Sequence, residues 1–230
     1  MNKRRLFIFV EGNDDQRFFT RIVRPLVESG YASVEIIMYA SMKSVNVCRF
    51  IRSITAMDHD FILCSDIDQE RNVKAKKIAL KTRFCTHLAD DRIVVIIQEI
   101  ESWYLAGLDE KAQKRYSLRP YRGTNHITKE IFNRMIPRNY ISRIAFMAEI
   151  LDHFKIDAAQ EKNRSFRYFF TRFVHPIVMG GNEKRDEVFA SERTTSQEIS
   201  RLGNIKERAG EDQVKPEVLH PPESGNEEDS

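Results

Sequence analysis

The chain lacks the features that mark membrane, secreted and disulfide-rich proteins. Its 230 residues hold only three cysteines, with no short pairing pattern, so neither a disulfide framework nor a cysteine-based zinc site is expected. No apolar run approaches the roughly 18 residues that a bilayer-spanning helix needs. The apolar stretch after the basic start ends at Glu11, which is too short for a secretory signal. We expect a cytoplasmic protein that does not enter a membrane.

Several catalytic classes are also missing their signatures. The six histidines show neither an H-E-x-x-H motif nor a paired ligand spacing, which argues against zinc. No glycine-rich Walker loop or dinucleotide fingerprint is present, so ATP hydrolysis would have to come from a partner. Cys64 lies inside an apolar run and is better interpreted as a small core residue than as a nucleophile.

Charge is present in quantity but is unevenly placed. The whole chain has 37 Lys+Arg and 34 Asp+Glu, a net charge of +3. Residues 1–180 hold 30 basic and 21 acidic residues, a net of +9, whereas residues 181–230 hold 7 and 13, a net of −6. The acidic segment has few large apolar residues and is expected to be disordered, with a short helix around Thr195–Leu202 left open.

The first hundred residues alternate between short apolar runs and helix-length amphipathic segments. This order predicts a four-stranded, mainly parallel sheet with helices on both faces, an α/β fold. The runs predicted as strands are Leu6–Val10, Val34–Tyr39, Phe61–Ser65 and Ile93–Ile97. The segments between them predict helices over about Asp14–Ser29, around Val45–Ile54 and over about Glu70–Leu88.

From Glu99 onward the pattern becomes helical. We expect a catalytic domain over residues 1–106, a C-terminal helical cap over residues 107–180 that packs on the sheet, and the acidic tail over residues 181–230. The predicted helices of this part are Glu99–Leu105, Lys129–Met135, Ile141–Phe154 and Ser165–Val174.

Acidic residues follow two of the predicted strands. Glu11 comes directly after the first strand, before any helix-capping position, while Asn13 or Asp14 has the alternative role of capping the next helix. The third strand runs into Asp66-x-Asp68, two carboxylates that point to one side if the chain is extended there. Asp68 has its own alternative as a helix cap. In a parallel sheet these strand ends share one edge, where α/β folds place their ligands.

Like charges at that spacing repel unless a cation or hydrogen-bond donors lie between them. Oxygen-only ligands suit Mg²⁺ or Mn²⁺. Glu11, Asp66 and Asp68 are therefore predicted metal ligands, and the chemistry that such a site serves is metal-assisted phosphoryl transfer or hydrolysis.

These motifs carry a family resemblance. Glu11 after one strand and Asp66-x-Asp68 after a later strand resemble the Toprim fold of topoisomerases, primases and OLD-family nucleases. Val10-Glu11-Gly12-x-x-Asp15 resembles the nuclease form of the first Toprim motif. The segments Gln98–Ala106 and Asn163–Phe169 resemble parts of small Toprim-like proteins of the RloB-like type, which are often encoded beside ABC-type ATPases in phage-defence operons.

The resemblance implies a Toprim-like catalytic domain with Asp15 as a further metal ligand. It also implies an ABC- or SMC-type ATPase partner. The sequence departs from the pattern at Gly107, where an acidic residue is expected after the Trp-Tyr-Leu-Ala segment. Glu99 and Glu101 are therefore secondary candidates.

Basic residues follow the acidic motif and supply candidates for phosphate binding. Lys74 and Lys77 lie on one face of the predicted third helix and are candidate catalytic residues that stabilise charge on the phosphate. The alternative is an ordinary solvated helix face. A second basic cluster surrounds Tyr116 and Tyr121, a mixture that suits single-stranded or looped nucleic acid. Arg164, Arg167 and Arg172 alternate with aromatic residues nearer the carboxyl end.

Two hypotheses follow. The first is a Mg²⁺- or Mn²⁺-dependent endonuclease that cleaves DNA or RNA, including tRNA, as the effector of an anti-phage system. The second is a non-catalytic regulatory or scaffold subunit that binds an ATPase partner. The sequence leaves the nucleic acid substrate, the number of metal ions and a homo-oligomeric state open.

Overall fold

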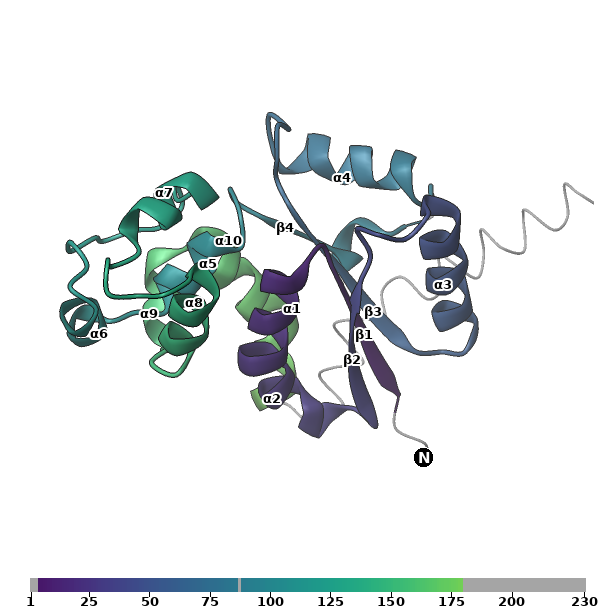
Figure 1. Cartoon of the computed structure of the whole chain (residues 1–230). Coiled ribbons are helices and arrows are strands. Elements are labelled where there is room, and N and C mark those ends of the chain that lie inside the picture. The colour runs from purple at the N-terminus through teal and green to yellow at the C-terminus, as the bar shows by residue number, and fades with distance from the viewer. Residues whose placement is uncertain (1–3, 87, 180–230) are drawn as a thin grey trace, which may run out of the picture. The chain divides into compact units, whose positions relative to one another are not determined.

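The computed structural model describes residues 4–86 and 88–179 (Figure 1). All of them belong to one compact unit, Met1–Ser191. The acidic segment 181–230, including the short helix considered at Thr195–Leu202, lies outside the described residues. None of the helices in the described part of the chain is long and apolar enough to span a membrane.

One four-stranded sheet forms the centre of the fold and confirms the predicted α/β class. Its strands are β1 (Arg5–Val10), β2 (Ser33–Met38), β3 (Asp60–Asp66) and β4 (Ile93–Ile96), in the order β2-β1-β3-β4. Every neighbouring pair is parallel. Each strand matches its predicted run to within one residue at either end. All four carboxyl ends therefore lie along the same edge.

Alternate side chains of the strands pack into two separate cores, as the period of two in a strand requires. In β1, Leu6, Ile8 and Val10 face one core, and Phe7 and Phe9 face the other. Strands β3 and β4 divide their apolar side chains in the same way. Both faces of the sheet are therefore covered, which explains why the strands consist of continuous apolar runs.

On the first face, the helix predicted over Asp14–Ser29 forms four successive helical pieces. They are α1 (Asn13–Phe18), the π turn η1 (Phe19–Val23), α2 (Arg24–Val27) and the 3-10 turn η2 (Glu28–Gly30). Pro25 explains the break, because it has no backbone N–H and its ring clashes with the carbonyl of the preceding turn. The π turn widens the helix just before this proline.

Two helices cover the second face, on the right and top of Figure 1: α3 (Ser44–Ala56) and α4 (Val73–Arg83). Val47, Ile51 and Ile54 of α3 are buried at helical spacing. Helix α4 is shorter than predicted, because Asn72 caps its start by accepting the Ala75 backbone N–H at 2.9 Å.

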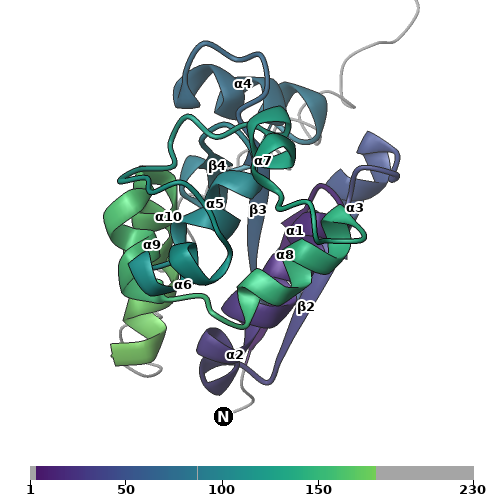
Figure 2. The same cartoon turned by 60° about the vertical axis from the view of Figure 1, so that its left-hand side comes forward.

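The rest of the described chain is helical and packs on the first face (Figure 2). Sequence reasoning did not predict α6 or α9. The elements are α5 (Glu101–Ala106), α6 (Glu110–Arg115), the 3-10 turn η3 (Asp90–Arg92) before β4, α7 (Lys129–Met135), α8 (Arg143–Leu151), α9 (Ile156–Lys162), α10 (Arg164–Phe169) and the π turn η4 (Phe170–Val174). An aromatic cluster joins these helices to α1, with the Trp103 ring 5.7 Å from Phe18 and 5.2 Å from Phe166.

Candidate functional site

The carboxyl edge of the sheet gathers acidic side chains from β1, α1, β3 and α5. Glu11 follows β1 beside the end of β3, where its Oε1 accepts hydrogen bonds from the hydroxyls of Tyr39 (3.1 Å) and Ser65. Burial and the nearby Glu11 charge raise the pKa of Tyr39, so this tyrosine stays a neutral donor. Glu11 Oε2 accepts no hydrogen bond from the described residues and is free to bind a ligand.

Asp15 is buried, with 5% of its surface exposed. Its Oδ2 accepts the Gly12 backbone N–H at 3.2 Å, and its Oδ1 is buried without any hydrogen-bond partner. Burial raises the pKa of Asp15 to about 7, and the charges of Glu11 and Glu101 add to the effect, although the Gly12 hydrogen bond opposes it. An exposed acidic residue in the first turn of a helix stabilises the helix through its dipole. Asp15 is in the first turn of α1, but its side chain is buried.

Asp66 ends β3 and resembles Asp15 in its surroundings. Its Oδ1 is buried without a hydrogen-bond partner. Burial raises the pKa of Asp66 well above its usual range, and the charges of Asp15, Glu11, Glu101 and Glu99 raise it further. The structure thus brings the predicted residues Glu11, Asp15 and Asp66 within electrostatic reach of one another.

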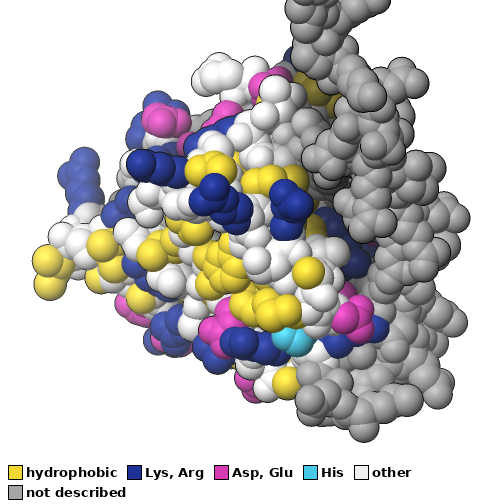
Figure 3. Space-filling view, turned by 90° about the vertical axis from the view of Figure 1, so that its right-hand side faces the viewer, with side chains coloured by type: hydrophobic (Ala, Val, Ile, Leu, Met, Phe, Trp, Pro, Cys, Tyr) yellow, Lys and Arg dark blue, Asp and Glu magenta, His cyan; other side chains and the backbone are white. Residues whose placement is uncertain are grey.

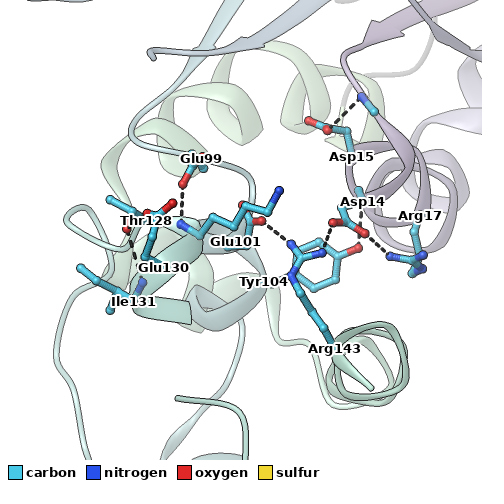
Figure 4. Close-up of polar contacts among 12 residues, drawn as sticks. Asp14, Asp15, Arg17, Glu99, Glu101, Tyr104, Thr128, Glu130, Ile131 and Arg143 are labelled. Carbon is cyan, nitrogen blue, oxygen red and sulfur yellow. Dashed lines mark hydrogen bonds and ion pairs between the residues drawn. The ribbon is translucent and has the colours of Figure 1, made fainter. Parts of the chain in front are cut away.

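Glu101 joins this edge from the first turn of α5 and is held by an arginine from α8. Arg143 donates one guanidinium N–H to Glu101 and another to Asp14 (Figure 4). Asp14 also pairs with Arg17 at 2.6 Å. Burial alone would raise the pKa of Asp14, but hydrogen bonds from Arg17 and Arg143 lower it. Arg143 and Arg17 together therefore compensate the charges of Asp14 and Glu101, whereas no basic side chain of the described residues pairs with Asp15 or Asp66.

Glu99 is placed at the edge of the group. Its carboxylate accepts the backbone N–H of Lys129 at the start of α7 (Figure 4). Burial raises the pKa of Glu101, and the charges of Glu99 and Asp14 contribute, against the opposing effect of Arg143. Both secondary candidates thus lie near the site, each already engaged by a partner.

Asp68, Lys74 and Lys77 do not lie as predicted, with Asp68 beside Asp66 and the two lysines directed at the site. Asp68 adopts a left-handed backbone conformation (φ 50°), and its exposed side chain forms an ion pair with Lys76. Lys76 is buried on the sheet side of α4, whereas Lys74 is exposed and Lys77 donates to the carbonyl of Asp90. Lys76 is the lysine held closest to the acidic motif. Lys76 lies four residues before the buried Leu80, so the two side chains share one face of the helix. This spacing is the feature of the sequence that could have identified Lys76.

The tyrosines of the second basic cluster are packed into the interior. Tyr116 is buried, and its hydroxyl lies 2.7 Å from His153 Nδ1. Tyr121 donates its hydroxyl to the Leu105 carbonyl at 2.8 Å. The Tyr116 ring is therefore not available to stack on a base, and the Tyr121 ring is half-buried.

The structure explains why residue 107 is a glycine, where the Toprim-like pattern has an acidic residue. A Cβ at this position would lie 2.1 Å from the ring of Phe154, and the Gly107 carbonyl accepts the Lys155 backbone N–H at 2.8 Å. An acidic side chain has no room here.

The donor chemistry of the edge fits a hard divalent cation. One carboxyl oxygen of Asp15 and one of Asp66 are buried without a hydrogen-bond partner. The raised pKa values of both groups show that their charged forms are costly here, and a bound cation would stabilise those charged forms in place of protons. Within residues 4–86 and 88–179, however, no three His, Cys, Asp or Glu side chains are already gathered as a metal site. The oxygens that would hold the ion are therefore present, but they do not converge on one point in this structure.

Comparison with protein-family models, with curated proteins and with solved structures finds no match to this chain.

Proposed function

We propose that this protein is a Mg²⁺- or Mn²⁺-dependent endonuclease that cleaves phosphodiester bonds of DNA or RNA. The observation that carries the proposal is the pair of buried, unpartnered carboxylate oxygens on Asp15 and Asp66 at the carboxyl edge of a parallel sheet. Buried polar groups in folded proteins nearly always have partners. The unpartnered oxygens of Asp15 and Asp66 belong to carboxyl groups that interact electrostatically with each other and with Glu11, and this supports a cation as their missing partner.

In this proposal Glu11, Asp15 and Asp66 would hold the metal ion. When bound, the ion would polarise the phosphate and lower the pKa of a water ligand. Glu11 is oriented through Oε1 by Tyr39 and Ser65, which leaves Oε2 to face the ion or to take a proton from the attacking water. Asp68 then acts through Lys76, which it holds as a positive charge beside the edge.

The reaction adds water across a P–O ester bond. The water oxygen bonds to phosphorus, the bond to one sugar oxygen breaks, and that oxygen leaves with a proton. Lys76 supplies positive charge for the phosphate oxygens, a role that the sequence assigned to Lys74 or Lys77.

The biological setting rests on the family resemblance. The likeness of Gln98–Ala106 and Asn163–Phe169 to small Toprim-like proteins supports a cytoplasmic effector of anti-phage defence that works with an ABC- or SMC-type ATPase. tRNA is among the candidate substrates.

The test is cleavage of single-stranded and structured DNA and RNA by the purified full chain with Mg²⁺ or Mn²⁺. We expect Asp15→Asn and Asp66→Asn each to reduce cleavage by roughly 100-fold or more, and to weaken Mn²⁺ binding measured by calorimetry. Asp68→Asn, which acts through its lysine partner, should cost roughly 10-fold. Asp58→Asn is the matched control, since Asp58 is an exposed acid paired with Arg4 before β3. Undiminished cleavage by both the Asp15 and Asp66 variants would refute the proposal.

A specific observation favours the second candidate, a regulatory or scaffold subunit. Arg143 already binds Glu101 and Asp14, and the described acids are not gathered as a metal site. If no nuclease activity is detected with or without a candidate ABC- or SMC-type ATPase, while the two proteins form a stable complex, the scaffold role replaces the nuclease.

A further inference from the structure

A basic groove follows the outer surface of α10 and η4. Its volume is about 480 Å³, and it is lined by Arg164, Arg167, Tyr168, Thr171 and Arg172. None of the carboxylates of the candidate site lines it. Positions 164, 168, 171 and 172 recur at helical spacing, so they present one continuous face.

The groove is strongly positive because little in the described chain neutralises it. The Arg164 guanidinium has no hydrogen bond or ion pair within residues 4–86 and 88–179. Arg167 is fixed by donating to the carbonyls of Gln160 (2.7 Å) and Glu161 (3.1 Å), which satisfies hydrogen bonds but leaves its charge uncompensated. Arg172 lies 3.8 Å from Asp91. Arg164 and Arg167 thus contribute two positive charges that no carboxylate of the described residues pairs with.

Tyr168 gives the groove an aromatic surface. Most aromatic rings of this segment are buried, as their helical spacing predicts, but 48% of Tyr168 is exposed. Its ring is held at the edge of Phe173, with centroids 6.3 Å apart. An exposed ring between guanidinium groups offers a flat face on which a base can stack.

The helix that carries the groove lies beside β4, the edge strand of the sheet. Next to Arg164, Ser165 accepts the Ile97 backbone N–H at 3.1 Å, just beyond the carboxyl end of β4. At the other end, Arg172 meets Asp91 in η3, immediately before β4 begins. Arg164 and Arg172 are eight residues apart, which is about 12 Å along a helix. The segment that carries the groove therefore runs alongside β4, and its amino end lies next to the carboxyl end of that strand.

We propose that this groove binds a single-stranded nucleic acid, with Arg164 and its neighbours on the phosphates and Tyr168 stacked on a base. The inference deepens the proposed nuclease function, on which it rests, by assigning the surface that delivers the strand to the site. Phosphates alone would be bound by the arginines, but an exposed ring beside them favours unpaired bases, because bases within a duplex are already stacked.

The test is binding of short fluorescent RNA and DNA oligonucleotides to the full chain in EDTA, measured by anisotropy over a range of salt concentrations. We expect Tyr168→Ala to weaken binding about fivefold or more. Arg164→Ala should weaken binding and reduce the slope of log K against log salt by about 0.7, the value of one phosphate contact on a single strand. Arg164 is exposed and makes no side-chain hydrogen bond or ion pair within the described residues, so this variant should fold normally.

Arg49→Ala is the matched control. Arg49 is an exposed arginine of α3 on the opposite face of the sheet. Figure 3 views the side of the molecule on which α3 lies, where Lys and Arg side chains are scattered among hydrophobic ones. Wild-type affinity in both groove variants would overturn the inference, as would tight binding of polyglutamate in place of oligonucleotides. Because the assay contains no metal, its result does not depend on catalysis. Groove-dependent binding in EDTA, together with no cleavage in the separate assays with Mg²⁺ and Mn²⁺, would refute the nuclease and leave the groove assignment intact.

Discussion

Two adjacent aspartates in α1 have opposite electrostatic surroundings. Arg17 and Arg143 lower the pKa of Asp14 in spite of its burial. Burial and the neighbouring acids raise the pKa of Asp15 to about 7. Consecutive residues of a helix point in different directions. In Figure 4 Asp14 meets Arg17 and Arg143, whereas Asp15 lies apart from both arginines. Arginines therefore compensate the charge of Asp14 but not that of Asp15.

Asp15→Asn should stabilise the metal-free protein above pH 7. A carboxyl group with a raised folded-state pKa binds more protons when folded, so stability falls as the pH rises from about 4 to about 7. The difference between 3.8 and about 7 corresponds to roughly 4 kcal/mol as an upper bound. Asparagine keeps an oxygen for the Gly12 N–H but carries no charge. Chemical denaturation in EDTA at pH 5 and pH 8 measures the effect, which should be large only at pH 8.

Asp14→Asn is the matched comparison, with the opposite sign expected. It removes the charge that pairs with Arg17 and Arg143, so it should destabilise the protein at pH 8 by about 1–3 kcal/mol. If Asp15→Asn lowers stability at pH 8 as much as Asp14→Asn does, then Asp15 is not an uncompensated charge in the metal-free protein.

The sequence located part of this site because strand ends are readable locally. Glu11 and Asp66 follow apolar runs, and the parallel sheet brings those ends to one edge. Arg143 could not be identified, since its partners Asp14 and Glu101 lie 129 and 42 residues away and no local pattern records such a pairing. Choosing Lys76 over Lys74 and Lys77 likewise required knowing which face of α4 meets the sheet.

At the scale of elements, a buried asparagine connects α10 to the rest of the fold. Asn163 Oδ1 caps α10 by accepting the Phe166 N–H at 3.0 Å. Its Nδ2 donates to the hydroxyls of Ser102 (3.2 Å) and Thr124 (3.1 Å), so one side chain joins α5, α10 and the loop before α7. The residue has no exposed surface. Every hydrogen bond that it makes is therefore shielded from water.

Asn163→Ala should cost about 2–4 kcal/mol of unfolding free energy. The loss of the cap accounts for about 1 kcal/mol, and the buried hydroxyls and N–H left without partners account for the rest. Asn72→Ala is the matched control, because Asn72 caps α4 with a hydrogen bond of 2.9 Å at an exposed position, and it should cost only about 1 kcal/mol. Urea denaturation compares the two variants, and equal losses would show that the buried network contributes nothing beyond the cap.

Elements were predictable where apolar residues marked them. The four strands and α3 carry strong apolar patterns, and each was identified. Helices α6 and α9 were missed because each is short and buries little: Ala112 and Gln113 in α6, and Ala159 alone in α9. Their positions follow from tertiary packing, which overrides weak local patterns.

At the scale of the described unit, the sheet makes its two cores depend on each other. Each central strand places alternate side chains in both cores, so one core cannot lose its packing while the strands keep the other intact. The helical part beyond residue 106 shares the first core with β1 and α1 through Trp103, Phe18 and Phe166. The sequence-based division at residue 106 therefore crosses a continuous aromatic cluster.

This continuity predicts a single cooperative unfolding transition for the described unit. Trp103 is the only tryptophan of the chain and is fully buried among aromatic rings of α1, η1 and α10. Its fluorescence should change at the same urea concentration as the far-UV circular dichroism, as two-state unfolding requires.

A tryptophan in the second core tests the other face of the sheet. The double variant Trp103→Phe, Phe84→Trp places the only tryptophan at position 84, where the Phe84 ring packs 5.3 Å from that of Tyr39. In each protein the two signals should share one midpoint. A fluorescence change that precedes the circular dichroism change for Trp103, but not for the relocated probe, would mean that the helical part separates from the sheet before the sheet unfolds.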